Sequence, residues 1–194
     1  MRRTQEALAL AVLSLVSAGT LIVSPAHAAA TKPAGCPTPT KAEVKRSHDG
    51  TVDRPPRGAT AIAGVRVNHI PKGFSHGSTL INKGDGISDY SYVWNNDRKD
   101  ADPKNRNLWV RVVCWKDADK LSRLKDAPII LGTFTHTKTA KIGGRKVLTK
   151  EGDGALGRGR YVGWVARKGV VITVMASPSL VPELDKIVKG IRLL

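Results

Sequence analysis

Two β-branched, aromatic-rich runs near the C-terminus form the clearest hydrophobic pattern in the chain. They lie at Tyr161–Ala166 and Val170–Ala176, and the polar link Arg167–Gly169 joins them. The glycine of this link can adopt the positive φ of a tight turn. Apolar runs joined by a short glycine-containing link are typical of β-hairpins. The sequence therefore predicts a hairpin over these residues.

A single amphipathic helix is predicted after the hairpin. The segment Ser177–Ser179 breaks the strand, and Pro182 suits the first turn of a helix, where a missing backbone N–H costs nothing. Apolar residues then follow at i, i+3, i+4 and i+7, namely Leu184, Ile187, Val188 and Ile191. This spacing gives the helix one apolar stripe, which we expect to pack across a sheet.

Shorter alternating runs predict the remainder of that sheet. We expect strands at Ala63–Asn68, Thr79–Asn82, Ser88–Asn95, Leu108–Trp115, Ile129–Thr139 and Arg145–Thr149. Pro71 follows the first of them, which favours an edge position. A short helix is expected over Asp117–Asp126, capped by Asp117 or Asp119. The pattern predicts an α+β fold, with a single, mostly antiparallel, curved sheet of six to eight strands and a C-terminal helix packed on it.

The N-terminal end has the pattern of a secretory signal peptide. Two arginines precede an apolar run from Ala7 to Val23, and a small-residue cleavage site ends at Ala28. We therefore expect residues 1–28 to be a signal peptide and the protein to be secreted. An uncleaved membrane anchor is the alternative, and it is disfavoured because the run is at the short end of what spans a bilayer.

The remaining chain divides into two parts by composition. Residues 29–60 are rich in proline, alanine and lysine, and we expect an extended arm with a short helical turn around Lys41–Arg46. Residues 61–194 are expected to form one domain, which is a length that can bury a substantial core.

Both cysteines, Cys36 and Cys114, lie in the part of the chain expected to be exported. An oxidising compartment favours a disulfide between them, which would tie the arm to the domain. Two free thiols are the alternative. Cys114 lies in a strand-like run without an evident activating base, so a nucleophilic role is disfavoured.

The charge of the chain points to an anionic partner. The formal net charge is +16 and the isoelectric point is about 10.3. Between Lys138 and Lys168, nine bases face only two acids. Several of them alternate along predicted strands, so we expect a basic face with the ligand-binding residues Lys138, Lys141, Arg145, Lys146, Arg158, Arg160, Arg167 and Lys168. The partner would be an anionic envelope polymer, lipid headgroups or nucleic acid.

Aromatic residues near this face have two interpretations. Tyr90, Tyr92, Trp109 and Trp115 would either stack against bases or sugar rings, or pack beneath the helix as core. The second interpretation is favoured because a small sheet needs large buried side chains.

No motif in the sequence identifies a catalytic, metal or cofactor site. The spacing G-x-G-x-x-G occurs at Gly152–Gly157, but a strand follows it where a dinucleotide fold needs a helix. The aspartates Asp97, Asp100 and Asp102 share one loop without the order and glycine of a calcium loop. We therefore predict no cofactor and no metal.

Four segments resemble a known protein family. They read "IPKGF" from Ile70, "IGGRKVLT" from Ile142, "YVGWVARKGVVITVMAS" from Tyr161 and "LVPELDKIVKGI" from Leu180. They are similar to a family of bacterial exported domains of unknown function, which resembles the extracytoplasmic ends of anti-sigma-factor-like proteins and small envelope lipoproteins. The resemblance covers Val65 to Leu194. It implies a sheet with a C-terminal helix outside the cytoplasm, and no catalytic residues.

These observations favour a secreted, non-enzymatic module that is associated with the cell envelope or binds a ligand through its basic face. A small hydrolase of the nuclease or phosphodiesterase kind, using His76 or His136 with an aspartate, is the first alternative. A protein-binding inhibitor that presents the loop from Gly152 to Gly159 is the second.

Overall fold

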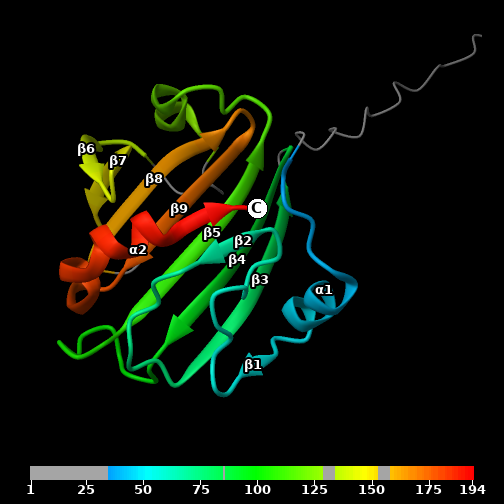
Figure 1. Cartoon of the computed structure of the whole chain (residues 1–194), viewed down its shortest axis with the longest axis vertical. Coiled ribbons are helices and arrows are strands. Elements are labelled where there is room, and N and C mark those ends of the chain that lie inside the picture. The colour runs from blue at the N-terminus through cyan, green and yellow to red at the C-terminus, as the bar shows by residue number, and fades with distance from the viewer. Residues whose placement is uncertain (1–34, 85, 129–133, 153–157) are drawn as a thin grey trace, which may run out of the picture.

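One eight-stranded antiparallel sheet dominates the described part of the computed structural model, which comprises residues 35–84, 86–128, 134–152 and 158–194. The strand order is β1-β3-β4-β5-β9-β8-β7-β6. The strands are β1 (Val52–Asp53), β3 (His76–Gly84), β4 (Ile87–Asn95), β5 (Asn107–Trp115), β6 (Lys138–Ile142), β7 (Arg145–Glu151), β8 (Arg160–Arg167) and β9 (Val170–Ala176). Figure 1 shows these strands with the helices around them. The predicted α+β class with one main sheet is confirmed.

The predicted C-terminal hairpin is formed by β8 and β9. Val162 lies opposite Val174, and Trp164 lies opposite Ile172. Gly169 in the connecting turn has φ +77°, which a side chain at this position would strain. On its other side β9 pairs with β5, so the hairpin joins the centre of the sheet directly.

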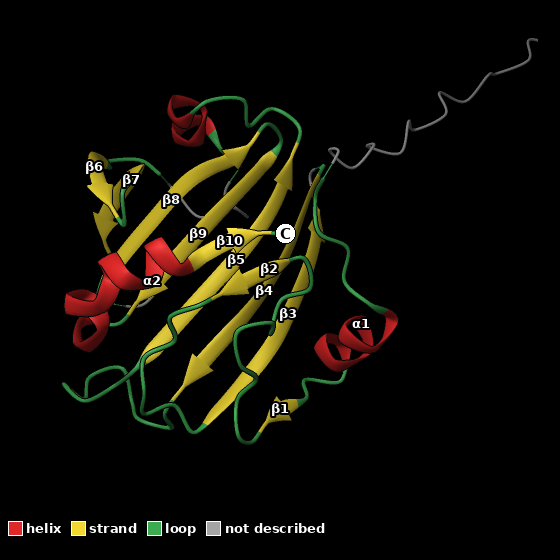
Figure 2. Cartoon of the chain, in the orientation of Figure 1, coloured by secondary structure: helices red, strands yellow, loops and turns green. Residues whose placement is uncertain are grey.

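The C-terminal helix α2 (Leu184–Gly190) packs on one face of the main sheet, as predicted (Figure 2). A 3-10 helix η3 (Pro178–Glu183) precedes it and contains Pro182. All four residues of the predicted apolar stripe are at most 4% exposed. The last of them, Ile191, is not helical, because the helix ends at Gly190.

A second, two-stranded sheet explains this early end. Residues Ile191–Leu193 form β10, which pairs antiparallel with β2 (Val65–Val67). The predicted first strand therefore exists, but it pairs with the C-terminus rather than with the main sheet. Both strands lie across the main sheet on the same side as α2 (Figure 2).

The segment before residue 61 packs against the sheet, although an extended arm was expected there. The helical turn expected near Lys41 is α1 (Lys41–His48), with Thr40 as its N-cap. The Thr40 Oγ1 accepts a hydrogen bond from the backbone N–H of Glu43, while Glu43 accepts one from the backbone N–H of Thr40 at 2.8 Å. This reciprocal capping box fixes the helix start, and β1 then pairs with β3.

Hydrophobic side chains fill both faces of the main sheet. On the α2 side, the core includes Tyr90, Tyr92 and Trp94, each at most 3% exposed. On the opposite side a second cluster contains Trp115, which is 6% exposed. The interpretation as core is correct for Tyr90, Tyr92 and Trp115, although Trp115 packs on the face away from α2. Trp109 is only partly buried and packs against the second cluster.

Two elements covering the second face differ from the prediction. The expected helix over Asp117–Asp126 is a 3-10 helix, η1 (Leu121–Asp126). Its N-cap is Lys120, which makes no side-chain capping hydrogen bond, so the predicted aspartate cap is wrong. A strand was expected over Ile129–Thr139. Residues 129–133 lie outside the described residues, residues 134–137 are not in a strand, and the last two residues belong to β6.

Candidate functional site

The pleat of β6 and β7 divides the predicted basic face between the two sides of the sheet. Lys141 lies opposite Lys146, and Ile142 lies opposite Arg145. Successive side chains of a strand point to opposite faces. Val147 belongs to the core beneath α2 and Leu148 to the other core. Arg145 therefore projects on the α2 side, together with Lys138, while Lys141 and Lys146 project on the opposite side.

The other predicted basic residues are also dispersed. Arg158 lines a cavity on the side opposite α2, and Lys168 lines a shallow depression beside Lys116. Arg160 lies 4.0 Å from the carboxylate of Glu151. The eight residues therefore do not form one continuous surface.

Two of them do meet in a cavity on the α2 side, together with a residue that the sequence did not single out for binding. Arg145 and Arg167 line a cavity of about 300 Å³ with Arg192 of β10. We call Arg145, Arg167 and Arg192 the arginine cluster. Trp164, Ile172 and Ile191 supply apolar parts of the wall. Arg145 comes from β7, Arg167 from the end of β8 and Arg192 from the last strand, so the cluster requires the whole C-terminal half to be folded.

Contacts with the C-terminal end of α2 hold the side chain of Arg145. Its Nε donates to the carbonyl of Val188 at 3.3 Å, and its Nη2 donates to the carbonyl of Ile191 at 2.6 Å. The guanidinium also lies over the Trp164 ring, with Cζ 5.5 Å from the ring centroid. A cation at a helix C-terminus is favoured by the helix dipole. Within the described residues, Nη1 of Arg145 makes no hydrogen bond, so it can donate to a ligand.

The turn before Arg145 brings β7 against α2. Gly143 and Gly144 have φ +58° and +78°, as a two-residue hairpin turn requires. A Cβ at Gly143 would lie 2.4 Å from the backbone nitrogen of Lys189, so no side chain fits there. The backbone N–H of Gly143 donates to the carboxylate of Asp185 at 2.7 Å. The glycine pair therefore determines where the arginine cluster forms.

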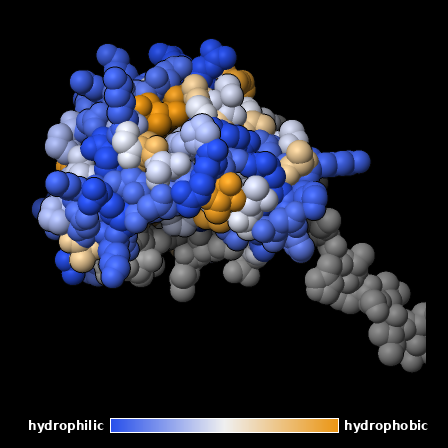
Figure 3. All heavy atoms as spheres, turned by 90° about the horizontal axis from the view of Figure 1, so that it is seen from below, coloured by the Kyte–Doolittle hydropathy of each residue, from blue (hydrophilic) through white to orange (hydrophobic). Residues whose placement is uncertain are grey.

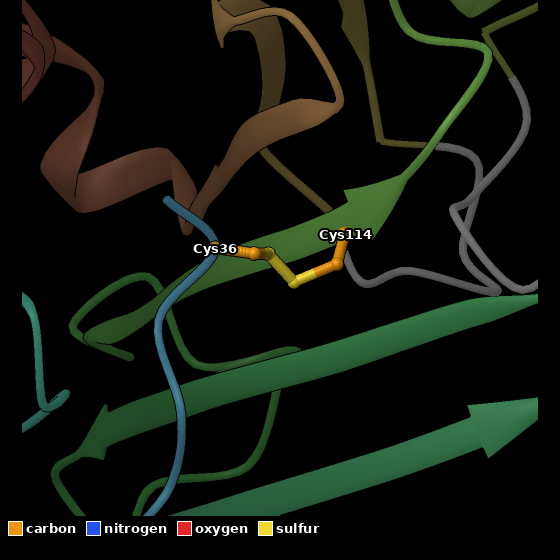
Figure 4. Close-up of a disulfide and its surroundings, with 2 residues drawn as sticks. All are labelled: Cys36 and Cys114. Carbon is orange, nitrogen blue, oxygen red and sulfur yellow. A yellow bond between two sulfur atoms is a disulfide. The ribbon is translucent and has the colours of Figure 1, made fainter. Parts of the chain in front are cut away.

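The disulfide lies next to this cluster. Cys36 and Cys114 form a disulfide with a Cα–Cα distance of 5.9 Å (Figure 4). A Cβ on the preceding residue, Gly35, would lie 2.5 Å from Nη1 of Arg167. The bond thus holds the segment at residue 35 against Arg167, and the predicted pairing is confirmed.

Like charges are left uncompensated around the cluster. Arg192 lies directly opposite Arg66 in the β2–β10 pair, and both side chains are exposed. Like charges at opposed positions of neighbouring strands are destabilising. Within the described residues, none of Arg66, Arg145, Arg167 and Arg192 forms an ion pair with a carboxylate. The Nε1 of Trp164 is also buried without a hydrogen-bond partner.

His76 lies beside an aspartate, as the hydrolase alternative requires, but the arrangement differs from that of a catalytic triad. His76 Nδ1 lies 2.9 Å from Asp97 Oδ1, while Ser75 Oγ donates to Asp97 Oδ2 at 2.6 Å. Ser75 Oγ also approaches the same ring nitrogen, at 3.2 Å. A catalytic serine and its carboxylate bond to opposite nitrogens of the histidine. The hydrogen bond from Ser75, with a second from Arg54, lowers the pKa of Asp97, so this group acts as an ion-pair network.

The remaining candidates give no constellation for chemistry. His136 is exposed with φ +57°. Asp100 accepts a hydrogen bond from Asn105, and Asp102 pairs with Arg98. Among the described residues, no three side chains of metal-ligating type converge. The glycine-rich segment 153–157 lies outside the described residues.

Hydrophobic residues on the described surface are few and scattered. None of the helices in the described ranges is long and apolar enough to cross a bilayer. The face seen in Figure 3 is mainly hydrophilic, with small separate hydrophobic patches. The large hydrophobic side chains that are exposed in the described residues include Val44, Val52 and Leu194. Scattered residues of this kind are ordinary for a protein surface.

Comparison of the chain with protein-family models, with curated proteins and with solved structures finds no match. The resemblance to exported bacterial domains therefore stays a prediction.

Proposed function

We propose that this chain is an exported, non-enzymatic module of the cell envelope, and that its arginine cluster binds an anionic polymer. The observation that carries the proposal is the convergence of three guanidinium groups on one cavity, with no carboxylate partner for any of them among the described residues. Bringing like charges together costs free energy that an internal acid would normally offset. A bound anion would offset it here.

The chemistry of arginine favours phosphate or carboxylate groups as the ligand. A guanidinium presents donors in a planar fork that matches the oxygens of these anions, whereas lysine acts as a point charge. Arg145 is already oriented by its two carbonyl contacts. A preorganised donor loses less conformational entropy on binding than a mobile one.

The buried aromatics distinguish between the possible polymers. Single-stranded nucleic acid is bound by stacking bases on accessible aromatic rings. Trp164 beside the cluster is 3% exposed, and Tyr90 and Tyr92 are core residues. We therefore propose a polymer recognised by its repeating phosphates, of which teichoic acid is an example. Nucleic acid and lipid headgroups are the competing partners in the test.

The test compares two double variants that remove the same charge. Arg167→Gln/Arg192→Gln removes two of the three guanidinium groups of the cluster, while Lys141→Gln/Lys146→Gln removes an exposed pair on the opposite side of the sheet. Binding of the secreted form to poly(glycerol phosphate), to single-stranded DNA and to anionic vesicles is measured by calorimetry at several salt concentrations.

We expect poly(glycerol phosphate) to bind most tightly and with a marked salt dependence. The arginine variant should lose at least about tenfold in affinity, because charge-assisted hydrogen bonds contribute about 1.5–3 kcal/mol each. The lysine variant should stay within about twofold. Equal losses in both variants would show that net charge alone drives binding, and the proposal would then be wrong.

Export is tested separately. Mass spectrometry of the protein from the culture medium of its native host should give a chain beginning at Ala29, as cleavage after Ala28 predicts. A cell-bound protein that retains the run Ala7–Val23 would instead indicate the anchor.

A further inference from the structure

A second cavity lies on the opposite side of the main sheet, away from the arginine cluster. Its volume is about 260 Å³, and Trp109 and Met175 form part of its floor. These two residues are paired across β5 and β9 and alternate with Val110 and Val174, which belong to the core beneath α2. Leu80 and Val93 extend the apolar wall. We call this cavity the Trp109 cleft.

Three polar atoms of residues that line the Trp109 cleft have no hydrogen-bond partner within the described part of the chain. They are Oδ1 of Asn105, Oδ1 of Asn107 and Nε1 of Trp109, and each is buried. Asn105 is only 4% exposed as a whole. Buried polar groups in folded proteins nearly always find a hydrogen-bond partner. Three such groups, at alternate positions from just before β5 into its first residues, therefore call for an external partner.

The orientation of the Asn105 amide is fixed by its neighbour. Its Nδ2 donates to Oδ1 of Asp100 at 3.2 Å. An ionised carboxylate only accepts hydrogen bonds, so the nitrogen must face Asp100 and the oxygen must face away from it. The backbone is held as well, since Ser177 Oγ donates to the carbonyl of Asn105 at 3.0 Å. The unpartnered acceptor is thus built into a rigid wall.

A buried ion pair holds the indole of Trp109. The guanidinium of Arg111 lies over the ring, with Cζ 4.8 Å from the centroid. Arg111 in turn donates to Oδ2 of Asp89 from Nε at 3.1 Å and from Nη2 at 2.6 Å. Both side chains are at most 5% exposed. A buried ion pair is rarely retained for net stability alone, and here it fixes one face of the indole and leaves the rest of the ring to a ligand.

We propose that the Trp109 cleft binds one ring of a saccharide. The C–H face of a sugar ring fits the apolar surface of Trp109 and Met175. Hydroxyl groups donate and accept, so they satisfy the two amide oxygens of Asn105 and Asn107 and the indole N–H together. Pockets for drug-sized ligands begin at about 300 Å³, so a cavity of about 260 Å³ suits a single ring. This site goes beyond the proposed polymer site and lies on the other face of the sheet.

The experiment uses the secreted form of the full chain, residues 29–194, and a panel of glucose, galactose, mannose, N-acetylglucosamine and their short oligomers. Adenosine and uridine serve as comparison ligands because their planar bases stack on indoles, so tighter binding of either would indicate a site for a base rather than for a sugar ring. Binding is followed by saturation-transfer NMR and by tryptophan fluorescence. Trp109→Phe keeps an aromatic floor but removes the N–H, and Asn107→Ala removes one acceptor. Asn68→Ala, at an exposed position on the α2 side, is the matched control.

At least one saccharide of the panel should bind saturably. Its affinity should fall at least about fivefold in both Trp109→Phe and Asn107→Ala, and stay within about twofold in Asn68→Ala. It should also be retained in Arg167→Gln/Arg192→Gln, which separates this site from the polymer site. Absence of saccharide binding, tighter binding of the nucleosides, or saccharide binding that both cleft variants retain would each overturn the inference. Circular dichroism of every variant confirms that it is folded, and Asn107→Ala keeps the test valid if Trp109→Phe is unstable.

Discussion

Removal of the disulfide tests how the N-terminal segment contributes to the fold. Cys36 and Cys114 are 78 residues apart, and both belong to the core beneath α2. Cross-linking a loop of this length removes about 4.5 kcal/mol of conformational freedom from the unfolded chain. Domains of this size have a total free energy of unfolding of about 5–15 kcal/mol. Cys36→Ala/Cys114→Ala should therefore be among the most destabilising changes in the molecule.

The measurement is urea unfolding followed by circular dichroism at neutral pH. We expect the midpoint to fall steeply and the free energy of unfolding to decrease by about 4 kcal/mol. The wild-type chain in excess reductant is the control, and it should unfold like the double variant. A decrease below about 1 kcal/mol would refute the reasoning, because it would mean that the segment from Cys36 to β1 is held by its other contacts alone.

Three further changes test separate parts of the structure. Ile187→Ala in α2, where the side chain is fully buried, should lower the free energy of urea unfolding by about 2–5 kcal/mol, whereas Val44→Ala, at 49% exposure, should change it by less than about 0.5 kcal/mol. Asp89→Ala should cost about 3–5 kcal/mol in the same assay, because it leaves the guanidinium of Arg111 buried without its carboxylate, and Asp89→Ala/Arg111→Leu should recover part of that loss. Burial raises the pKa of Glu43, but hydrogen bonds, first that from Tyr90, outweigh this effect and lower the native pKa below the ordinary value of 4.5. Its contribution to stability is therefore present above pH 4.5 and is lost as the pH falls through the lowered native pKa, so Glu43→Gln should flatten the fall in melting temperature between about pH 5 and 3.

Local patterns predicted the elements that depend on neighbouring residues. The β8–β9 hairpin depends on Gly169 and on two continuous apolar runs, and both are visible in the sequence. The α2 stripe depends on a spacing of three and four residues. The end of α2 was missed because Ile191 continues the apolar spacing equally well as a helical or as an extended residue. Its pairing with Val67 decides the matter, and that partner lies far away in the sequence.

The difference between local patterns and contacts with distant residues also explains why an extended arm was predicted for the N-terminal segment. Its prolines and polar residues contain no long apolar run, so the sequence offered no sign of a packed element. The structure stabilises it by polar contacts instead. Arg57 donates its backbone N–H to the hydroxyl of Tyr92 at 2.9 Å, and Trp94 donates its Nε1 to the carbonyl of Arg57 at 2.8 Å. These partners are buried aromatic residues of β4, and no local pattern identifies such a pairing.

The candidate sites show how tertiary structure regroups charges that are close in the sequence. Counting bases between Lys138 and Lys168 found the region, but a strand sends adjacent residues to opposite faces, so Arg145 and Lys146 cannot serve one ligand. The arginine cluster instead depends on Arg192 of β10, which lies outside the stretch from Lys138 to Lys168. A dense run of charge along strands therefore predicts two half-populated faces rather than one basic surface. The face proposed to bind is the one where guanidinium groups from distant strands converge without an acid among the described residues, and this convergence depends on the β10 pairing and not on local composition.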